Sequence, residues 1–261
     1  MSLWRTLRSH VRPLVYRFRN RLLYRMATFY VNVVDNDHDS DFYTNGEARF
    51  AHEMLPTSKV AFDVGAAFGN WSKIALEANP AIQLHCFEPT SRRFAALSKA
   101  VDGRATLNQL ALGDTPGEQQ IFYGASGGSN SIYPQRYNQE IYAASDVETI
   151  KISTIDDYCT THGIESVDFI KMDIEGYEPA ALRGAERMLR AGRIKVIQFE
   201  YSYVFLDAGA SLMGLMKYMA EVNPAYRFHK LMPEAAKPVT VYDHTLDNFK
   251  TQNWAIIKTG A

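Results

Sequence analysis

Residues Phe62–Ser72, with the sequence FDVGAAFGNWS, take an apolar strand into a helix through a turn of small residues. Such a turn leaves free backbone N–H groups at the start of the helix, and its glycines let a ligand approach closely. The pattern is D-x-G-x-x-x-G rather than the G-x-G-x-x-G of dinucleotide sites, and it begins with Asp63. A carboxylate there disfavours a pyrophosphate but attracts a sulfonium and an amino-acid ammonium group, as in S-adenosylmethionine. A purely structural turn is the alternative.

The chain on both sides of this turn alternates between expected strands and helices. Strands over 59–64 and 82–87 alternate with helices over 70–78 and 91–101, after a helix that ends at Pro56. This βαβα beginning predicts an α/β fold with a parallel sheet and helices on both faces. The other expected elements are strands over 106–112, 167–172, 194–199, 226–231 and 254–258, a hairpin of 119–123 with 148–152, and helices over 155–162, 179–190 and 212–222.

Acidic residues follow the second and third expected strands. Glu88, followed by Pro89, stands 25 residues after Asp63, and Asp114 follows the third strand. A carboxylate at the end of the second strand can accept hydrogen bonds from both ribose hydroxyls, and Asp114 can accept from an adenine amino group. Each residue alone could instead be a helix cap or a turn residue.

The most distinctive segment is VDFIKMDIEGYE, residues Val167–Glu178, in which a buried strand runs into an acidic turn before a helix. Asp173 stands at the strand end, where open α/β sheets place their chemistry. Glu175 and Glu178 follow it, and the structural alternative is that they stabilise the start of the helix through its dipole.

In this order, these segments resemble the FkbM-type S-adenosylmethionine-dependent methyltransferases, over about Gly46–Ser202. The matching segments are FDVGAAFGNWS, CFEP, ALGD, STIDDYC, IKMDIEGYEPAALRGA and QFEYS. The resemblance implies the Rossmann-like, seven-stranded class I methyltransferase sheet with its last strand antiparallel, and S-adenosylmethionine as the methyl donor. The implied cofactor-binding residues are Asp63, Gly65, Ala66, Ala67, Gly69, Ser72, Glu88, Pro89, Asp114 and Asp173. Ala67 departs from the family, which usually has Asn at this position.

The resemblance also implies O-methylation of a sugar, glycan or secondary metabolite. An unactivated hydroxyl is a poor nucleophile, so a carboxylate or a metal ion would help to remove its proton. The candidate base is Asp173 or Glu175, and Glu200, after the fifth strand, is a further catalytic candidate in the same acidic rim. These three could instead hold a divalent cation through their oxygens. Ser129, Asn130 and Ser131, in the loop of residues 124–133, are candidates for binding the acceptor substrate.

Composition separates the N-terminal segment from the rest of the chain. The first 25 of the 261 residues carry seven arginines and no acid, a charge of +7, whereas the remainder carries −8. Apolar residues from Trp4 to Leu22 recur at helical spacing, so we expect residues 1–45 to be a basic amphipathic helical extension with an acidic linker, and 46–261 to be the methyltransferase domain. The extension could lie on an anionic membrane surface, or pack on the body or on a second subunit.

Composition and motifs also limit the cellular locations and the classes of function that we expect. Two cysteines and no run of 18 apolar residues indicate a cytoplasmic protein. A location peripheral to the inner face of the membrane is the alternative. The missing G-x-G-x-x-G disfavours an NAD-dependent oxidoreductase, and the acidic body disfavours specific nucleic-acid binding. The alternative to an O-methyltransferase is a non-catalytic or N-methylating relative, tethered to a membrane or partner by its basic helix.

Overall fold

The computed structural model describes residues 11–13, 15, 20–124, 130–133 and 147–260. The chain divides into two compact units, Met1–Asp37 and His38–Ala261. In the first unit, helix α2 (Arg21–Asp35) begins at Asn20, whose side chain accepts from the backbone N–H of Leu22 at 2.8 Å. Most of the expected Trp4–Leu22 stripe lies outside the described residues, and the domain boundary at residue 45 stays a prediction. None of the helices that the structure describes is long and apolar enough to cross a membrane.

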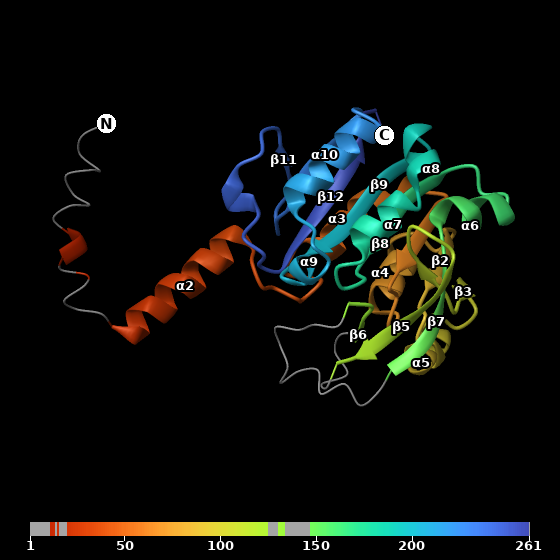
Figure 1. The fold of residues 1–261 in the computed structure, drawn as a ribbon, viewed down its shortest axis with the longest axis horizontal. Coiled ribbons are helices and arrows are strands. Elements are labelled where there is room, and N and C mark those ends of the chain that lie inside the picture. Colours follow the sequence, from red (N-terminus) through yellow and green to blue (C-terminus); the bar gives the residue numbers. More distant parts are fainter. Residues whose placement is uncertain (1–10, 14, 16–19, 125–129, 134–146, 261) are drawn as a thin grey trace. The chain divides into compact units, whose positions relative to one another are not determined.

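The second unit is built on an eight-stranded sheet with the order β11-β10-β12-β9-β8-β1-β2-β3 (Figure 1). Strands β3, β2, β1, β8 and β9 are parallel, whereas β12 is antiparallel to both of its neighbours, β9 and β10. The strands are β1 (Val60–Val64), β2 (Gln83–Phe87), β3 (Thr106–Asn108), β8 (Val167–Met172), β9 (Ile194–Tyr201), β10 (Tyr226–Leu231), β11 (Ala236–Val239) and β12 (Gln252–Lys258). The parallel sheet and the antiparallel last strand of the class I methyltransferase fold are confirmed.

The prediction of seven strands was wrong by one, because β11 adds an eighth at the edge of the sheet. Strand β11 pairs only with β10, in antiparallel register, and contains Pro238. Proline lacks the N–H that a central strand needs, so its presence argues against a strand except at an edge, where β11 lies.

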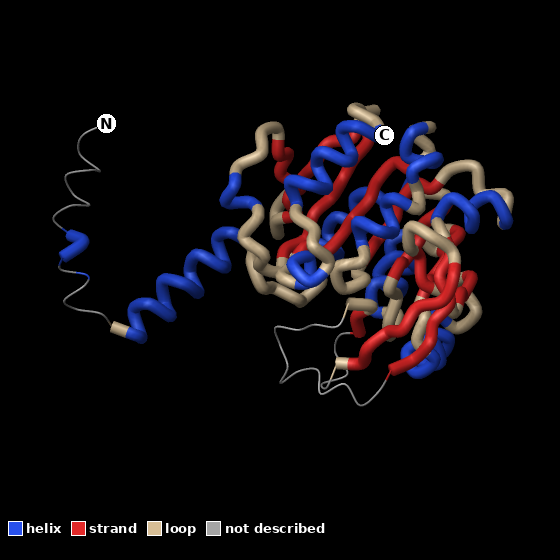
Figure 2. Tube along the Cα trace, in the orientation of Figure 1, coloured by secondary structure: helices blue, strands red, loops and turns tan. Residues whose placement is uncertain are grey.

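Helices cover both faces of the sheet (Figure 2), as predicted. One core cluster packs the helices between residues 47 and 101 against the sheet, and the other packs the helices between residues 155 and 222 against it. The helices are α3 (Glu47–Met54), η1 (Leu55–Thr57), α4 (Asn70–Ala78), α5 (Ser91–Val101), α6 (Ile155–Thr161), α7 (Glu178–Arg183), α8 (Glu186–Arg190), α9 (Val204–Asp207), α10 (Leu212–Val222) and η2 (His244–Leu246).

The single helix expected over residues 179–190 is two short helices, α7 and α8. The interruption lies at Gly184, where an added Cβ would stand 1.9 Å from the carbonyl oxygen of Gly113. Because the two backbones meet this closely, the chain needs glycine here.

A second sheet, with the order β4-β7-β5-β6, lies after β3 in the chain. It consists of β4 (Ala111–Leu112), β5 (Gly117–Tyr123), β6 (Asn130–Ser131) and β7 (Val147–Ser153). The antiparallel pairing of β5 with β7 confirms the expected hairpin. The strand expected over 106–112 is divided, since β3 belongs to the large sheet and β4 to the small one.

Candidate functional site

A cleft lies at the C-terminal ends of β1, β2 and β8, next to the second sheet. One side is formed by the β1–α4 turn and the end of β2, and the other by the segment after β8. Apolar side chains complete it: Leu112 and Ile121 from the second sheet, and Ile132 just after β6.

The β1–α4 turn reaches the cleft through residues in the left-handed backbone region. Gly65 has φ +81°, and a Cβ there would stand 2.1 Å from the carbonyl oxygen of Asp173, so only glycine fits. Ala67 has φ +47°, a conformation that alanine adopts at a cost and that asparagine tolerates better. The family preference for Asn at this position therefore has a backbone explanation. Gly65 and Ala67 line the cleft.

Asp63 lies beneath this turn, inside the sheet, and is completely buried. One of its carboxylate oxygens accepts from the Ser72 hydroxyl at 2.5 Å, and the other has no hydrogen-bond partner among the described residues. Burial raises the pKa of Asp63 above its usual range. Neither Asp63 nor Ser72 lines the cleft, and the same holds for Ala66 and Gly69. These four residues lie in the turn or in the two elements that it joins, and they contribute to its shape without lining the cleft.

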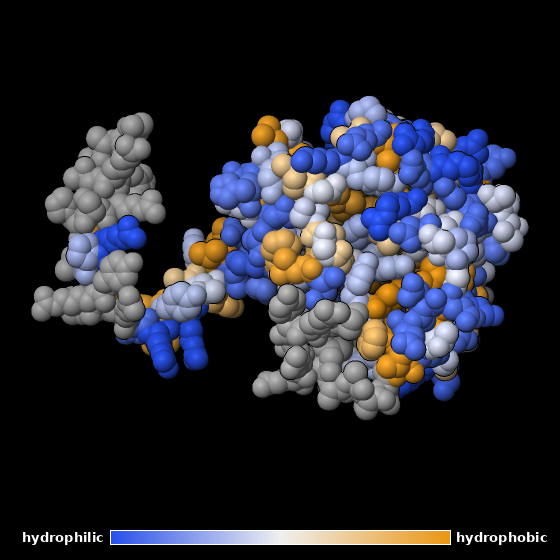
Figure 3. Space-filling view, in the orientation of Figure 1, coloured by the Kyte–Doolittle hydropathy of each residue, from blue (hydrophilic) through white to orange (hydrophobic). Residues whose placement is uncertain are grey.

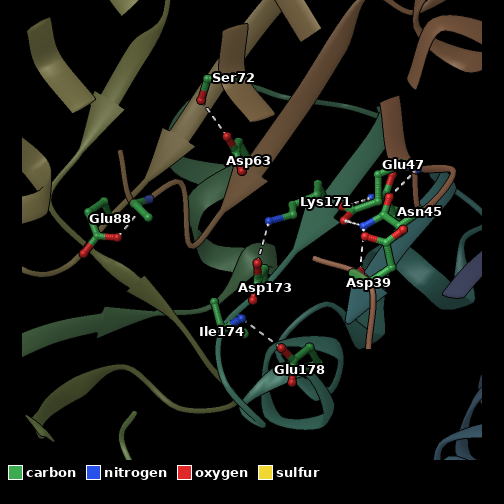
Figure 4. Close-up of polar contacts among 12 residues, drawn as sticks. Asp39, Asn45, Glu47, Asp63, Ser72, Glu88, Lys171, Asp173, Ile174 and Glu178 are labelled. Atoms are coloured by element: carbon green, nitrogen blue, oxygen red, sulfur yellow. Dashed lines mark hydrogen bonds and ion pairs between the residues drawn. The ribbon is translucent and has the colours of Figure 1, made fainter. Parts of the chain in front are cut away.

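Glu88 lies at the end of β2, is 2% exposed, and lines the cleft together with Pro89. Its Oε1 accepts from the backbone N–H and the hydroxyl of Thr90, at 2.9 and 2.6 Å. Its Oε2 accepts from the backbone N–H of Ala67 at 3.1 Å (Figure 4). Burial raises the pKa of Glu88, and the hydrogen bonds from Thr90 and Ala67 oppose that rise. The carboxylate is thus fixed in position against the turn.

Asp114 does not line the cleft. Its carboxylate is 3.1 Å from the Arg183 guanidinium in a half-exposed ion pair. The backbone and side chains just before it, from Leu110 to Leu112, form that part of the wall instead.

Asp173 lines the cleft and forms an ion pair with Lys171, whose Nζ lies 3.1 Å from Asp173 Oδ2 (Figure 4). Lys171 is buried in β8, beside Asp63 in the parallel register with β1. Burial disfavours the ammonium, but the carboxylates of Asp173, Asp63 and Glu47 outweigh it and raise the pKa of Lys171. The lysine therefore stays charged.

Glu47, at the start of α3, belongs to the same buried group. Its carboxylate accepts from the side-chain amides of Asn45 at 2.8 Å and Gln198 at 2.6 Å. Burial raises the pKa of Glu47 to about 7. Sequence reasoning missed Glu47 and Lys171; a lysine within an otherwise apolar strand was the available signal for the second.

Glu175 lines the cleft just after β8, with φ +54°. Burial, followed by the neighbouring charges of Asp173 and Glu178, raises the pKa of Glu175 to about 8. Glu178 is buried, accepts from the backbone N–H of Ile174 at 2.8 Å, and has its pKa raised to about 7, mainly by burial. Glu175 is thus a carboxyl group that changes charge near neutral pH at the surface of the cleft.

Glu200, on β9, does not line the cleft. Burial and the charges of Asp173 and Glu175 raise the pKa of Glu200 well above its usual range. Among the described residues, no three His, Cys, Asp or Glu side chains are arranged to hold a metal ion. The three acids do not form the predicted cation site.

Of the three predicted acceptor-binding residues, Ser129 lies outside the described residues. Asn130 lines the cleft and is 6% exposed, and both polar atoms of its amide lack a hydrogen-bond partner in the part of the chain described. The Ser131 hydroxyl donates to the carbonyl oxygen of Glu175 at 3.1 Å, which ties β6 to the turn after β8. Arg93, on α5, also lines the cleft, and no sequence signal singled it out.

Comparison with known proteins gives a consistent picture. The family model described as the methyltransferase FkbM domain matches residues 63–229. The chain is 31% identical over 157 residues to the 2-O-methyltransferase NoeI of Sinorhizobium fredii (strain NBRC 101917 / NGR234), a match that covers 55% of this chain and 63% of NoeI. It is 28% identical over 181 residues to the 31-O-demethyl-FK506 methyltransferase FkbM of Streptomyces tacrolimicus, covering 54% of this chain and 70% of that protein. A solved structure of a putative O-methyltransferase from Klebsiella pneumoniae aligns with a TM-score of 0.47 at 12% identity, covering 95% of this chain and 94% of that one.

Proposed function

The chain belongs to the FkbM methyltransferase family, and we propose that its cleft binds S-adenosylmethionine and methylates a hydroxyl group of a sugar, glycan or secondary metabolite. The observation that carries this proposal is the fixed contact between Glu88 and the turn at Ala67, at the C-terminal edge of the sheet. The names of the two relatives, a 2-O-methyltransferase and an O-demethyl-FK506 methyltransferase, support oxygen as the methylated atom.

The residues of the cleft fit this cofactor chemically. Glu88 has acceptor capacity that its three protein donors do not fill, which suits a ribose hydroxyl. The apolar wall of Leu112, Ile121 and Ile132 suits a nucleobase. Asp173, the ion-pair partner of Lys171, places a carboxylate on the remaining side, where a sulfonium and an ammonium group are attracted.

When bound, S-adenosylmethionine supplies a methyl group already activated by its positively charged sulfur. The protein must then hold the acceptor oxygen in line with that methyl and remove one proton. We assign proton removal to Glu175, because it faces the cleft and its pKa of about 8 lies near neutrality, where a general base is most effective. Asp173, paired with Lys171, supplies fixed negative charge beside it.

The other polar groups have separate proposed tasks. Asn130 offers a donor and an acceptor to the cleft without protein partners, so we assign it to recognition of the acceptor substrate. Glu200 does not line the cleft, so we propose that it acts only through its neighbours. We retain a cytoplasmic location as a prediction, which cell fractionation checks.

Two measurements test the proposal. Isothermal calorimetry should show micromolar binding of S-adenosylmethionine and none of NAD. The protein is then incubated with S-adenosylmethionine that carries tritium in its methyl group and with a panel of sugars and macrolides. We expect one acceptor to become labelled, and its analogue with hydrogen in place of the hydroxyl to remain unlabelled. Binding of NAD in preference to the sulfonium donor would overturn the cofactor assignment, and labelling only of amines would overturn O-methylation.

A further inference from the structure

Helix α2 separates its side chains into a polar stripe and a broad apolar face. At 3.6 residues per turn, Arg21, Arg25, Thr28 and Asn32 fall on one side. The opposite side, called here the apolar face of α2, consists of Leu22, Leu23, Met26, Phe29, Tyr30, Val33 and Val34. No residue of α2 is buried, and these seven are between 53% and 72% exposed. Figure 3 shows both hydrophobic and hydrophilic atoms along this helix.

This helix is well formed at both of its ends. Asn20 caps the first turn, and Asn36 adopts the left-handed conformation at the last, where its backbone N–H donates to Asn32 and Val33. A 15-residue helix is about 22 Å long. Isolated exposed apolar residues are ordinary on protein surfaces, but a contiguous face of this size marks an interaction site.

The charge of the chain around α2 indicates the chemistry of its partner. Seven arginines and no acidic residue occur in the first 25 positions, and the first acid is Asp35, at the end of the helix. The rest of the chain has a net charge of −8. A partner that satisfies both features must offer an apolar layer and a high density of negative charge side by side.

We infer that α2 binds the surface of an anionic phospholipid membrane, lying in the plane of the interface. The acyl boundary would receive the apolar face of α2, while the arginines would contact phosphate groups. The aromatic rings of Tyr24, Phe29 and Tyr30 suit the same boundary, because such side chains prefer the membrane–water interface. A second copy of the helix is a poorer occupant, since two segments of charge +7 would repel each other. This inference does not depend on the proposed methyl transfer.

The test is sedimentation of the full-length chain with sucrose-loaded vesicles of phosphatidylcholine alone, or of phosphatidylcholine with 30% phosphatidylglycerol. Two matched variants add one negative charge to the same helix on opposite sides: Met26→Asp on the apolar face and Thr28→Asp on the polar stripe. We expect binding to the anionic vesicles to be at least tenfold stronger than to neutral ones. Met26→Asp should weaken it at least tenfold, and Thr28→Asp no more than threefold.

Each other outcome overturns the proposal in a recognisable way. Equal binding to both vesicle types would show that the arginines do not contribute to binding. An equal loss of binding in both variants would show that only the net charge of the helix matters, and not its apolar face. Absence of vesicle binding, together with a dimer in light scattering that Met26→Asp dissociates, would make a second copy the occupant. An unchanged melting temperature in both variants shows that the body of the protein is folded, so a negative vesicle result is not a folding artefact.

Discussion

Replacing Glu88 tests the proposed cofactor site most directly. An ionised carboxylate offers about four acceptor positions. Three are occupied by the backbone N–H and hydroxyl of Thr90 and the backbone N–H of Ala67, which leaves about one for a ligand. The carboxylate should therefore form one strong hydrogen bond to the ribose, rather than the two that its position in the sequence suggested.

The expected loss of affinity follows from that single hydrogen bond. A hydrogen bond to a charged group contributes about 1.5–3 kcal/mol, and every 1.4 kcal/mol corresponds to about tenfold in the dissociation constant. Glu88→Ala should weaken binding about 10- to 150-fold. Glu88→Gln, which keeps a neutral hydrogen-bonding group, should lose about 1–1.5 kcal/mol, or about 5- to 12-fold.

The assay is isothermal calorimetry with S-adenosylhomocysteine, which binds without turnover. Glu118→Ala is the matched control, because it removes one carboxylate from an exposed position that does not line the cleft. Since Glu88→Ala also leaves buried donors without an acceptor, urea denaturation must show that the variant is folded at the assay temperature. A folded Glu88→Ala protein that binds within threefold of the unchanged chain would refute the ribose assignment.

Four further predictions concern the turn, the base, the buried acids and the orphaned amide. Ala67→Gly should raise the free energy of unfolding by about 0.5–1 kcal/mol, because glycine adopts the left-handed conformation without strain. Urea denaturation measures this free energy, and a lower value for the variant would contradict the left-handed conformation at residue 67. With Glu175 as the base, the methyl-transfer rate should rise as the pH passes through about 8. Glu175→Gln should be about 10²–10⁴-fold slower, and its rate should not rise over this pH range. If the pH–rate profile of the variant is the same as that of the unchanged chain, Glu175 is not the base. The pKa of Glu47 is about 7 in the native state and 4.5 ordinarily, so the contribution of this group to stability declines as the pH rises from 4.5 through 7. Glu47→Gln should therefore gain stability relative to the unchanged chain between about pH 5 and 8. A difference in unfolding free energy between the two proteins that stays constant over this range would contradict the raised pKa. Asn130→Leu should leave the melting temperature equal or higher while raising the acceptor KM about tenfold, because it removes an unpaired buried amide; a lower melting temperature with unchanged KM would point to a structural role.

Elements whose boundaries depend on local signals could be predicted from the sequence. The expected ranges of α4, α5, α10, β8 and β10 coincide with those of the structure. In these elements a clear apolar period is bounded by a turn or capping residue, such as Ser211 before α10, whose side chain accepts from the backbone N–H of Gly214.

Features that depend on distant parts of the chain could not be predicted. The interruption at Gly184 is set by the approach of Gly113, some 70 positions earlier, which no local pattern records. Asp114 has the spacing of a ligand-binding acid, but its position beside Arg183 is a tertiary contact. The sequence identified which strand ends carry acids, and the packing decides which of them face the cleft.

Of the acidic neighbours of Lys171, only Asp173 lines the cleft among the described residues. Asp63 and Glu47 are enclosed and held by uncharged partners, Ser72 for the first and Asn45 and Gln198 for the second, and burial raises the pKa of both. Together with Asp173, these two carboxylates raise the pKa of Lys171, which remains charged. Asp173 is the partner at ion-pair distance and also lines the cleft. The lysine therefore holds the carboxylate of Asp173 at the edge where the proposed sulfonium donor would bind.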